Sequence, residues 1–314
     1  MKKILFVDDA HPVLKAELES MGFICDDFTG STAADCRKVI GDYFGAVIRS
    51  KITFDAAMLD AATQLRFIAR VGAGMESIDV VYAKSKGIVC FNSPEGNRDA
   101  VAEHAIGMLL SLLNNLNRAD AEVRKGIWLR EANRGTEIKD KTIGIIGYGN
   151  MGGAFAQRLK GFGCKVLAYD KYKTGFNDGF VTECDMETIF AETDILSLHV
   201  PLTEETRYLV DGNYINRFAK NFWLINTSRG PVVNTVALVG ALKSGKVNGA
   251  ALDVLEYEKT SFEAMDAGAF PEPLKQLVAF DNVILSPHIA GWTVESKYKL
   301  AKVLAEKIRM HFFG

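Results

Sequence analysis

The chain has 314 residues and a formal net charge of −2, and 48% of its residues are hydrophobic. This length predicts two domains with ample cores, and the nearly balanced charge gives no reason to expect nucleic acid as a partner. The five cysteines are scattered, odd in number and never at C-x-x-C spacing, which argues against a disulfide framework and a metal site. No signal-peptide core and no run of about 20 apolar residues is present, so no membrane is expected and a cytoplasmic location fits best.

The first part of the chain alternates short apolar runs with helical patterns, which is typical of a parallel α/β fold. Strands are predicted at Ile4–Val7, Ala46–Arg49, Phe67–Val71 and Ile88–Phe91. A helix is predicted over Pro12–Ser20, and one unusually long helix from Asp99 to about Arg124.

The second part repeats this rhythm after a polar stretch, Trp128–Asp140. Strands are predicted at Thr142–Ile146, Lys165–Tyr169, Ile195–Val200, Trp223–Asn226, Ala250–Val254 and Val283–Ser286. The alternation predicts two doubly wound parallel-sheet units, the second beginning near the long helix. The final helical pattern, Thr293–Phe313, is a candidate to return to the first unit, which would make the first domain discontinuous.

A glycine-rich turn follows the strand Thr142–Ile146 and has the spacing G-x-G-x-x-G over residues 147–152. In a strand–turn–helix context, Gly147 permits the tight turn, Gly149 lets a pyrophosphate approach the backbone, and Gly152 lets helix and strand pack closely. The helix start at Asn150 and Met151 would hold the negative pyrophosphate on its N–H groups. These features predict a dinucleotide site.

An acid ends the next predicted strand, 18 residues after Gly152. Asp170 is at the expected distance to accept hydrogen bonds from the adenosine ribose, and its charge repels a 2′-phosphate, so NAD is favoured over NADP. Lys171 and Lys173 follow directly and leave some use of NADP open.

Three polar groups in the second part each follow an apolar strand, where sites form in open α/β sheets. Arg229 can bind a substrate carboxylate through two parallel charge-assisted hydrogen bonds. His288 can take a hydroxyl proton as a hydride leaves, and a carboxylate can orient its ring. Glu256 and Glu258 are both candidates for that carboxylate.

With these residues in place, the chain closely resembles the D-isomer-specific 2-hydroxyacid dehydrogenase family, and above all its short phosphoglycerate dehydrogenase branch. Five stretches carry the resemblance, in the family's order: Gly147–Gly152, His199–Thr203, Asn226–Gly230, Gly249–Val254 and Ser286–Gly291.

The resemblance implies a Rossmann NAD-binding domain over residues 98–286, inserted into a flavodoxin-like substrate domain formed by residues 1–97 and 287–314. It implies Arg229, Glu258 and His288 as the catalytic set, and a homodimer built around the long predicted helix. It also implies cofactor contacts outside the glycine-rich turn, with Asp253 at the nicotinamide end: Val200, Pro201, Thr206, Thr227, Ser228, Asp253 and Ala290.

The first part of the chain narrows the range of possible substrates. Val47–Lys51 resembles the strand-end segment that phosphoglycerate dehydrogenases place near the substrate phosphate, which makes Arg49 and Ser50 candidate ligands. Arg70–Asp79 resembles the loop whose backbone N–H groups bind the substrate carboxylate, here at Ala73 and Gly74. The alternative for Arg49 is an ion pair with an acid of its own domain.

Some features depart from the family pattern. Lys259 follows Glu258 where most relatives have proline, the stretch Lys259–Ala279 is longer than in many relatives, and Trp292 follows the histidine motif. They leave open an unphosphorylated substrate, such as glyoxylate, hydroxypyruvate, D-lactate or a bulkier D-2-hydroxy acid. Because the last helix ends the chain, no C-terminal serine-sensing domain is expected.

Two other classes of protein match parts of the sequence. Ile4–Asp9 resembles the start of a response-regulator receiver, but the required phosphoacceptor aspartate does not follow the predicted strand Ala46–Arg49. Some relatives of the dehydrogenases act as NAD-responsive interaction scaffolds, and the activity of the purified protein separates a scaffold from an enzyme.

Overall fold

The computed structural model describes residues 2–258 and 267–314, and within it the chain divides into two compact units. Unit 1 consists of residues 1–98 and 292–314, and unit 2 of residues 99–291. The chain therefore leaves unit 1 after Arg98 and re-enters it at Trp292.

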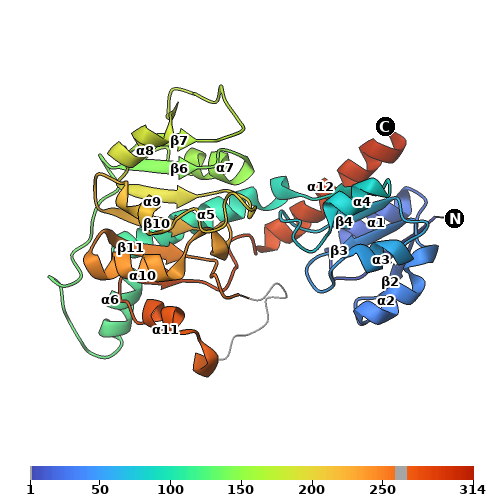
Figure 1. Ribbon diagram of the computed structural model, residues 1–314, viewed down its shortest axis with the longest axis horizontal. Coiled ribbons are helices and arrows are strands. Elements are labelled where there is room, and N and C mark those ends of the chain that lie inside the picture. The colour runs from blue at the N-terminus through green and yellow to red at the C-terminus, as the bar shows by residue number, and fades with distance from the viewer. Residues whose placement is uncertain (1, 259–266) are drawn as a thin grey trace. The chain divides into compact units, whose positions relative to one another are not determined.

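Unit 1 is built around a five-stranded parallel sheet with the order β2-β1-β3-β4-β5 (Figure 1). Its strands are β1 (Lys3–Phe6), β2 (Ile24–Asp27), β3 (Gly45–Ile48), β4 (Phe67–Arg70) and β5 (Val89–Phe91). Its helices are α1 (Pro12–Ser20), α2 (Ala33–Val39), α3 (Ala56–Ala61), α4 (Val80–Ser85) and α12 (Val294–Phe313), with a short 3-10 turn at Ile40–Asp42. The strand order reverses between β1 and β3, which is where ligands bind in sheets of this kind.

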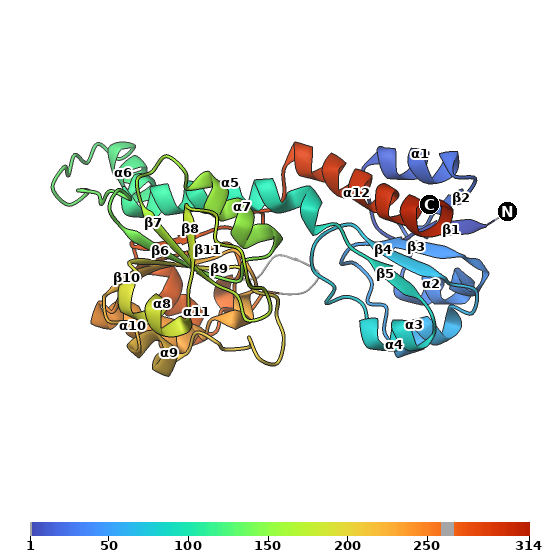
Figure 2. The same ribbon diagram turned by 90° about the horizontal axis from the view of Figure 1, so that it is seen from above.

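Helices cover both faces of this sheet, as Figure 2 shows, with α1 and α12 on one face and α2, α3 and α4 on the other. The alternation of side chains along each strand explains the two cores. On β1, for example, Ile4 and Phe6 join the core under α1 and α12, whereas Leu5 joins the core under α2–α4. Both cores are formed by strands that are apolar on each face, as buried parallel strands require.

Unit 2 contains a seven-stranded parallel sheet with the order β12-β11-β10-β9-β6-β7-β8. Its strands are β6 (Thr142–Ile146), β7 (Lys165–Tyr169), β8 (Val181–Glu183), β9 (Ile195–Leu198), β10 (Phe222–Asn226), β11 (Val247–Leu252) and β12 (Val283–Leu285). Its helices are α6 (Leu116–Val123), α7 (Asn150–Arg158), α8 (Met186–Glu192), α9 (Gly212–Asn216), α10 (Thr235–Ser244) and α11 (Glu272–Val278), with 3-10 turns at Gly230–Val232 and Ala267–Ala269. Helix α5 (Pro94–Leu113) starts in unit 1 and continues into unit 2.

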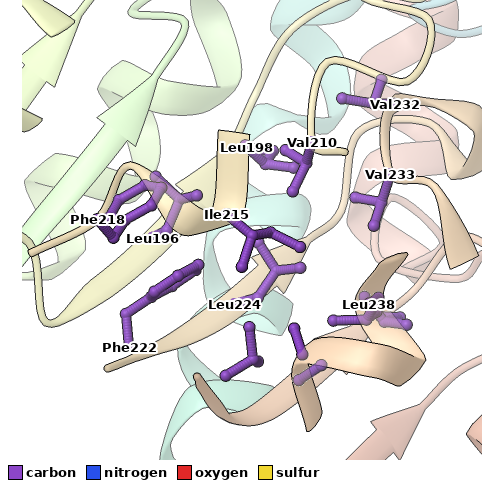
Figure 3. Packing of buried hydrophobic residues seen from close by; sticks show 14 of the residues in the cluster. Leu196, Leu198, Val210, Ile215, Phe218, Phe222, Leu224, Val232, Val233 and Leu238 are labelled. Carbon is purple, nitrogen blue, oxygen red and sulfur yellow. The ribbon is translucent and has the colours of Figure 1, made fainter. Parts of the chain in front are cut away.

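The sheet of unit 2 also lies between two helical layers. One core joins it to α5 and α7, and the other joins it to α8–α11. Figure 3 shows part of the second core, in which Phe218 and Phe222 stack with ring centroids 4.2 Å apart beside Leu196 and Leu224. The strand order reverses between β6 and β9, so the end of β6 is the switch point of this sheet.

The predicted class of two doubly wound parallel-sheet units is confirmed, but one predicted element is wrong. The long helix expected from Asp99 to Arg124 is two helices, α5 and α6, and α5 already begins at Pro94. Asn115 separates them with a left-handed backbone (φ 53°), a conformation that asparagine tolerates better than most residues and that no α-helix can contain.

The borders of the two units differ slightly from the predicted domain borders, 97/98 and 286/287. The first unit ends at Arg98, and residues 287–291 belong to unit 2. The backbone N–H of His288 donates to the carbonyl of Asp253 (2.8 Å), which ties this segment to the end of β11. The NAD-binding role of unit 2 and the substrate-binding role of unit 1 are not shown by these borders.

Candidate active site

The glycine-rich turn lies at the switch point of unit 2, between β6 and α7. Gly147 has a φ of 90°, and a Cβ built on it would lie 2.6 Å from the carbonyl oxygen of His199. A Cβ on Gly152 would lie 2.0 Å from the carbonyl oxygen of Gly147. Any side chain at either position would force the backbone apart, so the turn requires these glycines.

Helix α7 begins at this turn with its first N–H groups open to a ligand. Its N-cap is Gly149, and no side chain caps the helix. A Cβ on Gly149 would meet no atom within 4 Å, so there is free space over the helix start. Uncapped N–H groups and the positive end of the helix dipole together favour a negatively charged group.

Asp170 follows β7 and faces the same turn. Its Oδ2 accepts from the N–H of Tyr148 (2.7 Å), and its Oδ1 accepts from the N–H groups of Tyr172 (2.9 Å) and Lys173 (3.0 Å). These bonds fix the carboxylate beside the turn, where it can still accept from ribose hydroxyls because each oxygen has two lone pairs.

The two lysines after Asp170 are both engaged. Lys171 forms an ion pair with Glu205, which also accepts a hydrogen bond from the hydroxyl of Tyr172. The ammonium of Lys173 donates to the carbonyl of Tyr148 (3.2 Å). Since Glu205 offsets the charge of Lys171, this cluster offers little attraction to a 2′-phosphate.

Four of the other predicted cofactor residues fall into two groups. Val200 packs beside Gly147, and the buried hydroxyl of Thr227 has no hydrogen-bond partner among the described residues, which marks it as a candidate ligand contact. The hydroxyls of Thr206 and Ser228 are instead used inside the protein, because they donate to the carbonyl of Pro201 (2.6 Å) and to Asn226 (2.7 Å).

The turns after β10 and β11 pack directly on each other. Arg229 follows β10, and a Cβ on the next residue, Gly230, would lie 2.0 Å from the carbonyl oxygen of Leu255. One guanidinium nitrogen of Arg229 donates to the carbonyl of Ser228 (2.7 Å). This close approach brings the arginine turn beside the segment that contains Glu256 and Glu258.

Asp253 anchors the loop that carries His288. Its carboxylate is 1% exposed and accepts from the hydroxyl of Ser286 (2.6 Å) and from the N–H groups of Ile289 (2.9 Å) and Ala290 (2.8 Å). These bonds hold the loop in place, and the contact of Asp253 with the nicotinamide end of the cofactor stays a prediction.

His288 has a left-handed backbone (φ 56°), which is unusual for a residue other than glycine. Its N–H donates to the carbonyls of Asp253 (2.8 Å) and Ser286 (3.0 Å), so the neighbouring strand holds the conformation in place. In this position its Nδ1 lies 3.0 Å from Oε1 of Glu258. Backbone strain held by several hydrogen bonds is common where a side chain has to be aimed.

Glu258, and not Glu256, is the acid that meets the imidazole. Glu256 accepts from the hydroxyl of Tyr208 (2.8 Å) and from the N–H of Thr235 (2.9 Å), so its carboxylate stabilises two neighbouring turns. This geometry favours Glu258, the acid that the family resemblance implies. Lys259, the first departure from the family pattern, lies outside the described residues, as do residues 260–266.

Two histidines in unit 2 were not predicted as functional. Nε2 of His104, on α5, lies 3.0 Å from the hydroxyl of Ser286 and 3.6 Å from the carboxylate of Asp253. His199 is partly buried, and desolvation lowers its pKa from 6.5 to about 3. His199 lies within one of the five stretches that carry the family resemblance, which gave it no role of its own.

Unit 1 places the predicted substrate residues at the carboxyl edge of its own sheet. Arg49 follows β3 at the switch point, and its N–H donates to Asp8 (2.5 Å), which follows β1. Ser50 comes next and is half-buried. The N–H groups of Ala73 and Gly74, after the adjacent strand β4, make no hydrogen bond to any described residue. Unpaired N–H groups at this edge suit an anion.

Comparison with known proteins gives a consistent family. The sequence model for "D-isomer specific 2-hydroxyacid dehydrogenase, NAD binding domain" matches residues 106–290. The chain is 37% identical to a hydroxypyruvate reductase of Thermotoga maritima, over 86% of this chain and 85% of that one. It is 34% identical to a D-3-phosphoglycerate dehydrogenase of Archaeoglobus fulgidus, over 95% of this chain but only 56% of that one.

A solved structure agrees with this assignment. The D-lactate dehydrogenase of Aquifex aeolicus, solved with NAD and lactic acid, superposes with a TM-score of 0.81 and 27% identity, over 99% of this chain and 95% of that one. The chain belongs to the D-isomer specific 2-hydroxyacid dehydrogenase family. It is an NAD-dependent oxidoreductase, and the glycines and the buried hydroxyl of Thr227 described above fit the dinucleotide.

Cofactor choice should depend on Asp170. We expect Asp170→Asn to lower the preference for NADH over NADPH at least tenfold, about 1.4 kcal/mol, because the amide removes the charge that repels a 2′-phosphate. The measurement is kcat/KM with each cofactor on the same oxo acid. Glu205→Gln, which frees Lys171, should shift the ratio in the same direction but less. An unchanged ratio in both variants would contradict this role.

Proposed function

We propose that this protein is a cytoplasmic D-2-hydroxyacid dehydrogenase that oxidises 3-phospho-D-glycerate to 3-phosphohydroxypyruvate, the reaction that feeds serine biosynthesis. The choice of substrate is supported by the position and the contacts of the Arg49 side chain. Its guanidinium makes neither an ion pair nor a hydrogen bond with any described residue, although it follows a strand at the ligand-binding edge of unit 1. A cation left unpaired at such an edge suits a phosphate.

The proposed roles in unit 2 follow from its geometry. Arg229 binds the substrate carboxylate with its planar fork of donors. His288 removes the hydroxyl proton of the substrate, and Glu258, 3.0 Å from Nδ1, fixes the ring and balances the charge that the ring gains. When bound, NAD supplies the nicotinamide ring that accepts the hydride from C2 of the substrate.

The proposed roles in unit 1 concern binding only. Arg49, with Ser50 beside it, binds the phosphate. The N–H groups of Ala73 and Gly74 bind a carboxylate, and the side-chain amide of Asn92 holds their loop by donating to the carbonyl of Ala73 (2.7 Å).

A glyoxylate or hydroxypyruvate reductase is the second candidate, and a dehydrogenase for another D-2-hydroxy acid belongs with it. It is favoured by the similarity to the hydroxypyruvate reductase of Thermotoga maritima, which extends over most of both chains. A non-enzymatic NAD-responsive scaffold is a remote third candidate.

The test is a side-by-side assay of NADH oxidation with 3-phosphohydroxypyruvate, hydroxypyruvate, glyoxylate and pyruvate. We expect kcat/KM to be at least tenfold higher for the phosphorylated acid, about 1.4 kcal/mol of transition-state preference. A preference for an unphosphorylated acid would replace phosphoglycerate by the second candidate. No activity on any of the four would favour the scaffold.

The cysteines support the proposed cytoplasmic location. All five cysteines are free thiols, which fits a reducing cytoplasm. Among the residues that the structure describes, no helix combines the length and the apolar character needed to cross a bilayer.

We further propose that the protein is a homodimer, supported by an apolar surface around α6. No residue of α6 is buried, and Trp128 beyond it is 74% exposed. The exposed apolar side chains of this surface are Leu116, Val123, Ile127, Trp128 and Leu129. Such clustering on a helix and the segment after it is typical of a face covered by a partner.

The mass of the protein in solution tests this proposal. We expect the double variant Ile127→Glu/Leu129→Glu to elute as a monomer in size exclusion with light scattering, whereas the unaltered chain elutes as a dimer. Val236→Glu, which alters a single exposed apolar residue on α10, is the control and should leave the mass unchanged. A monomeric unaltered chain would refute the dimer.

A further inference from the structure

The guanidinium of Arg49 is stacked on an indole of its own unit. Its central carbon lies 3.7 Å from the centroid of the Trp292 ring, well within the range of a cation–π contact. Trp292 is the first residue of the returning segment of unit 1, just before the capped start of α12 at Thr293. The indole is 58% exposed, so its position is not explained by burial in a core.

The charged side chains of Asp8, Asp9 and Lys51 near Arg49 bind groups other than its guanidinium. Oδ2 of Asp8 accepts from the backbone N–H groups of Arg49 and Lys51 (3.3 Å for the second) and not from the guanidinium. The ammonium of Lys51 donates to backbone carbonyls, and Asp9 pairs with Lys297 (2.7 Å). Burial lowers the pKa of Arg49, while the charges of Asp8 and Asp9 raise it, and arginine remains charged at any physiological pH.

The stacking has a geometric consequence. An arginine that lies flat on an aromatic ring has one face covered, and its plane can no longer rotate freely. The edge of the guanidinium stays accessible to a ligand, and its parallel N–H donors match two oxygens of one phosphate or carboxylate group. The expected ligand of this pair is therefore an oxyanion that approaches in the plane of the guanidinium.

We propose that Trp292 is a specificity-determining residue, which holds Arg49 in the orientation that receives a second anionic group at the far end of a 2-hydroxy or 2-oxo acid. This inference rests on the proposed function, because it assumes the dehydrogenase reaction, but it does not require that the distal anionic group is a phosphate. In the sequence, Trp292 was one of the departures from the family pattern that left an unphosphorylated substrate open, whereas its contact with Arg49 supports a substrate with a distal anion. The substrate class is a hydroxy acid with two anionic ends.

The test compares substrates with and without the distal anion. The probes are 3-phosphohydroxypyruvate and oxaloacetate, which carry a phosphate or a carboxylate at the far end, and hydroxypyruvate, which carries neither. For Trp292→Ala we expect the ratio of kcat/KM for an anion-tailed acid over hydroxypyruvate to fall about tenfold, mainly through KM. Trp292→Phe should retain most of the ratio because a benzene ring still stacks.

Three further variants separate this role from a structural one. In Arg49→Ala the ratio should already be low, and adding Trp292→Ala should not lower it again, because the two residues act as one unit. Tyr298→Ala removes another exposed aromatic ring, which contacts His11 in the same unit, and should leave the ratio unchanged.

The outcomes distinguish this inference from the proposed function. A chain that prefers oxaloacetate in a Trp292-dependent way supports the inference and discards phosphoglycerate. If Trp292→Ala lowers kcat/KM equally for all three acids, or if the effects of Arg49→Ala and Trp292→Ala simply add, the inference is overturned whichever acid is preferred. A chain without activity is tested by thermal unfolding, where the stabilisation by millimolar phosphoglycolate must disappear in Trp292→Ala.

Discussion

Replacing His288 with alanine should lower kcat by roughly 10²- to 10⁴-fold, the usual contribution of a positioned general acid–base group. The imidazole is the proton acceptor in the proposed reaction, and its Nδ1 lies 3.0 Å from Oε1 of Glu258. The measurement is steady-state turnover of the best acid from the substrate panel, together with the KM for NADH.

Two controls make this prediction specific. Glu258→Gln keeps an oxygen that can accept from the ring but removes the balancing charge, so the loss of turnover should be smaller than in His288→Ala. The KM for NADH should stay within about twofold, because neither side chain belongs to the glycine-rich turn. Near-normal turnover of His288→Ala would rule out the assignment.

Replacing Asp253 with alanine should affect stability and turnover together. It would leave Ser286, Ile289 and Ala290 without their common acceptor in a buried site. Each unmade buried hydrogen bond costs about 1–3 kcal/mol, so we expect the free energy of unfolding to fall by about 3 kcal/mol or more. Turnover should fall as well, since the released loop carries His288.

Denaturant unfolding and kcat of the same preparations check this prediction. Ser286→Ala removes one donor and should cost less on both measures, and Asp281→Ala, an exposed acid just before β12, should change neither. An Asp253→Ala variant with lost turnover but unaltered stability would point instead to a direct contact with the cofactor. Full stability with full turnover would refute any anchoring role.

The interior strands were predictable from sequence because a strand buried on both faces is continuously apolar. The strands β2 and β8 were missed, and both lie at sheet edges. An edge strand has one neighbour and tolerates polar side chains, as the residues of Ile24–Asp27 illustrate. The break at Asn115 was missed because the helical pattern continues across it.

The candidate site was predictable where residue type alone restricts the chemistry, as with the glycines and the strand-end His288. The residue types alone left Glu256 and Glu258 open, since both follow the same strand. The family resemblance implied Glu258, and in the structure its carboxylate lies 3.0 Å from His288 whereas Glu256 binds Tyr208. The loop contacts of Asp253 were also not predictable. A buried acid at a strand end is equally compatible with binding a ligand or anchoring a loop, and only the structure shows the three donors that surround it.

The return of the chain to unit 1 has a consequence for folding during synthesis. The core under α1 includes Leu300, Leu304 and Ile308 of α12, so one face of the first sheet stays partly uncovered until these residues have left the ribosome. Unit 2 lies within one continuous stretch and has all of its strands by then. The N-terminal unit is therefore completed last, and its exposed apolar face is the surface that chaperones would have to shield in the meantime.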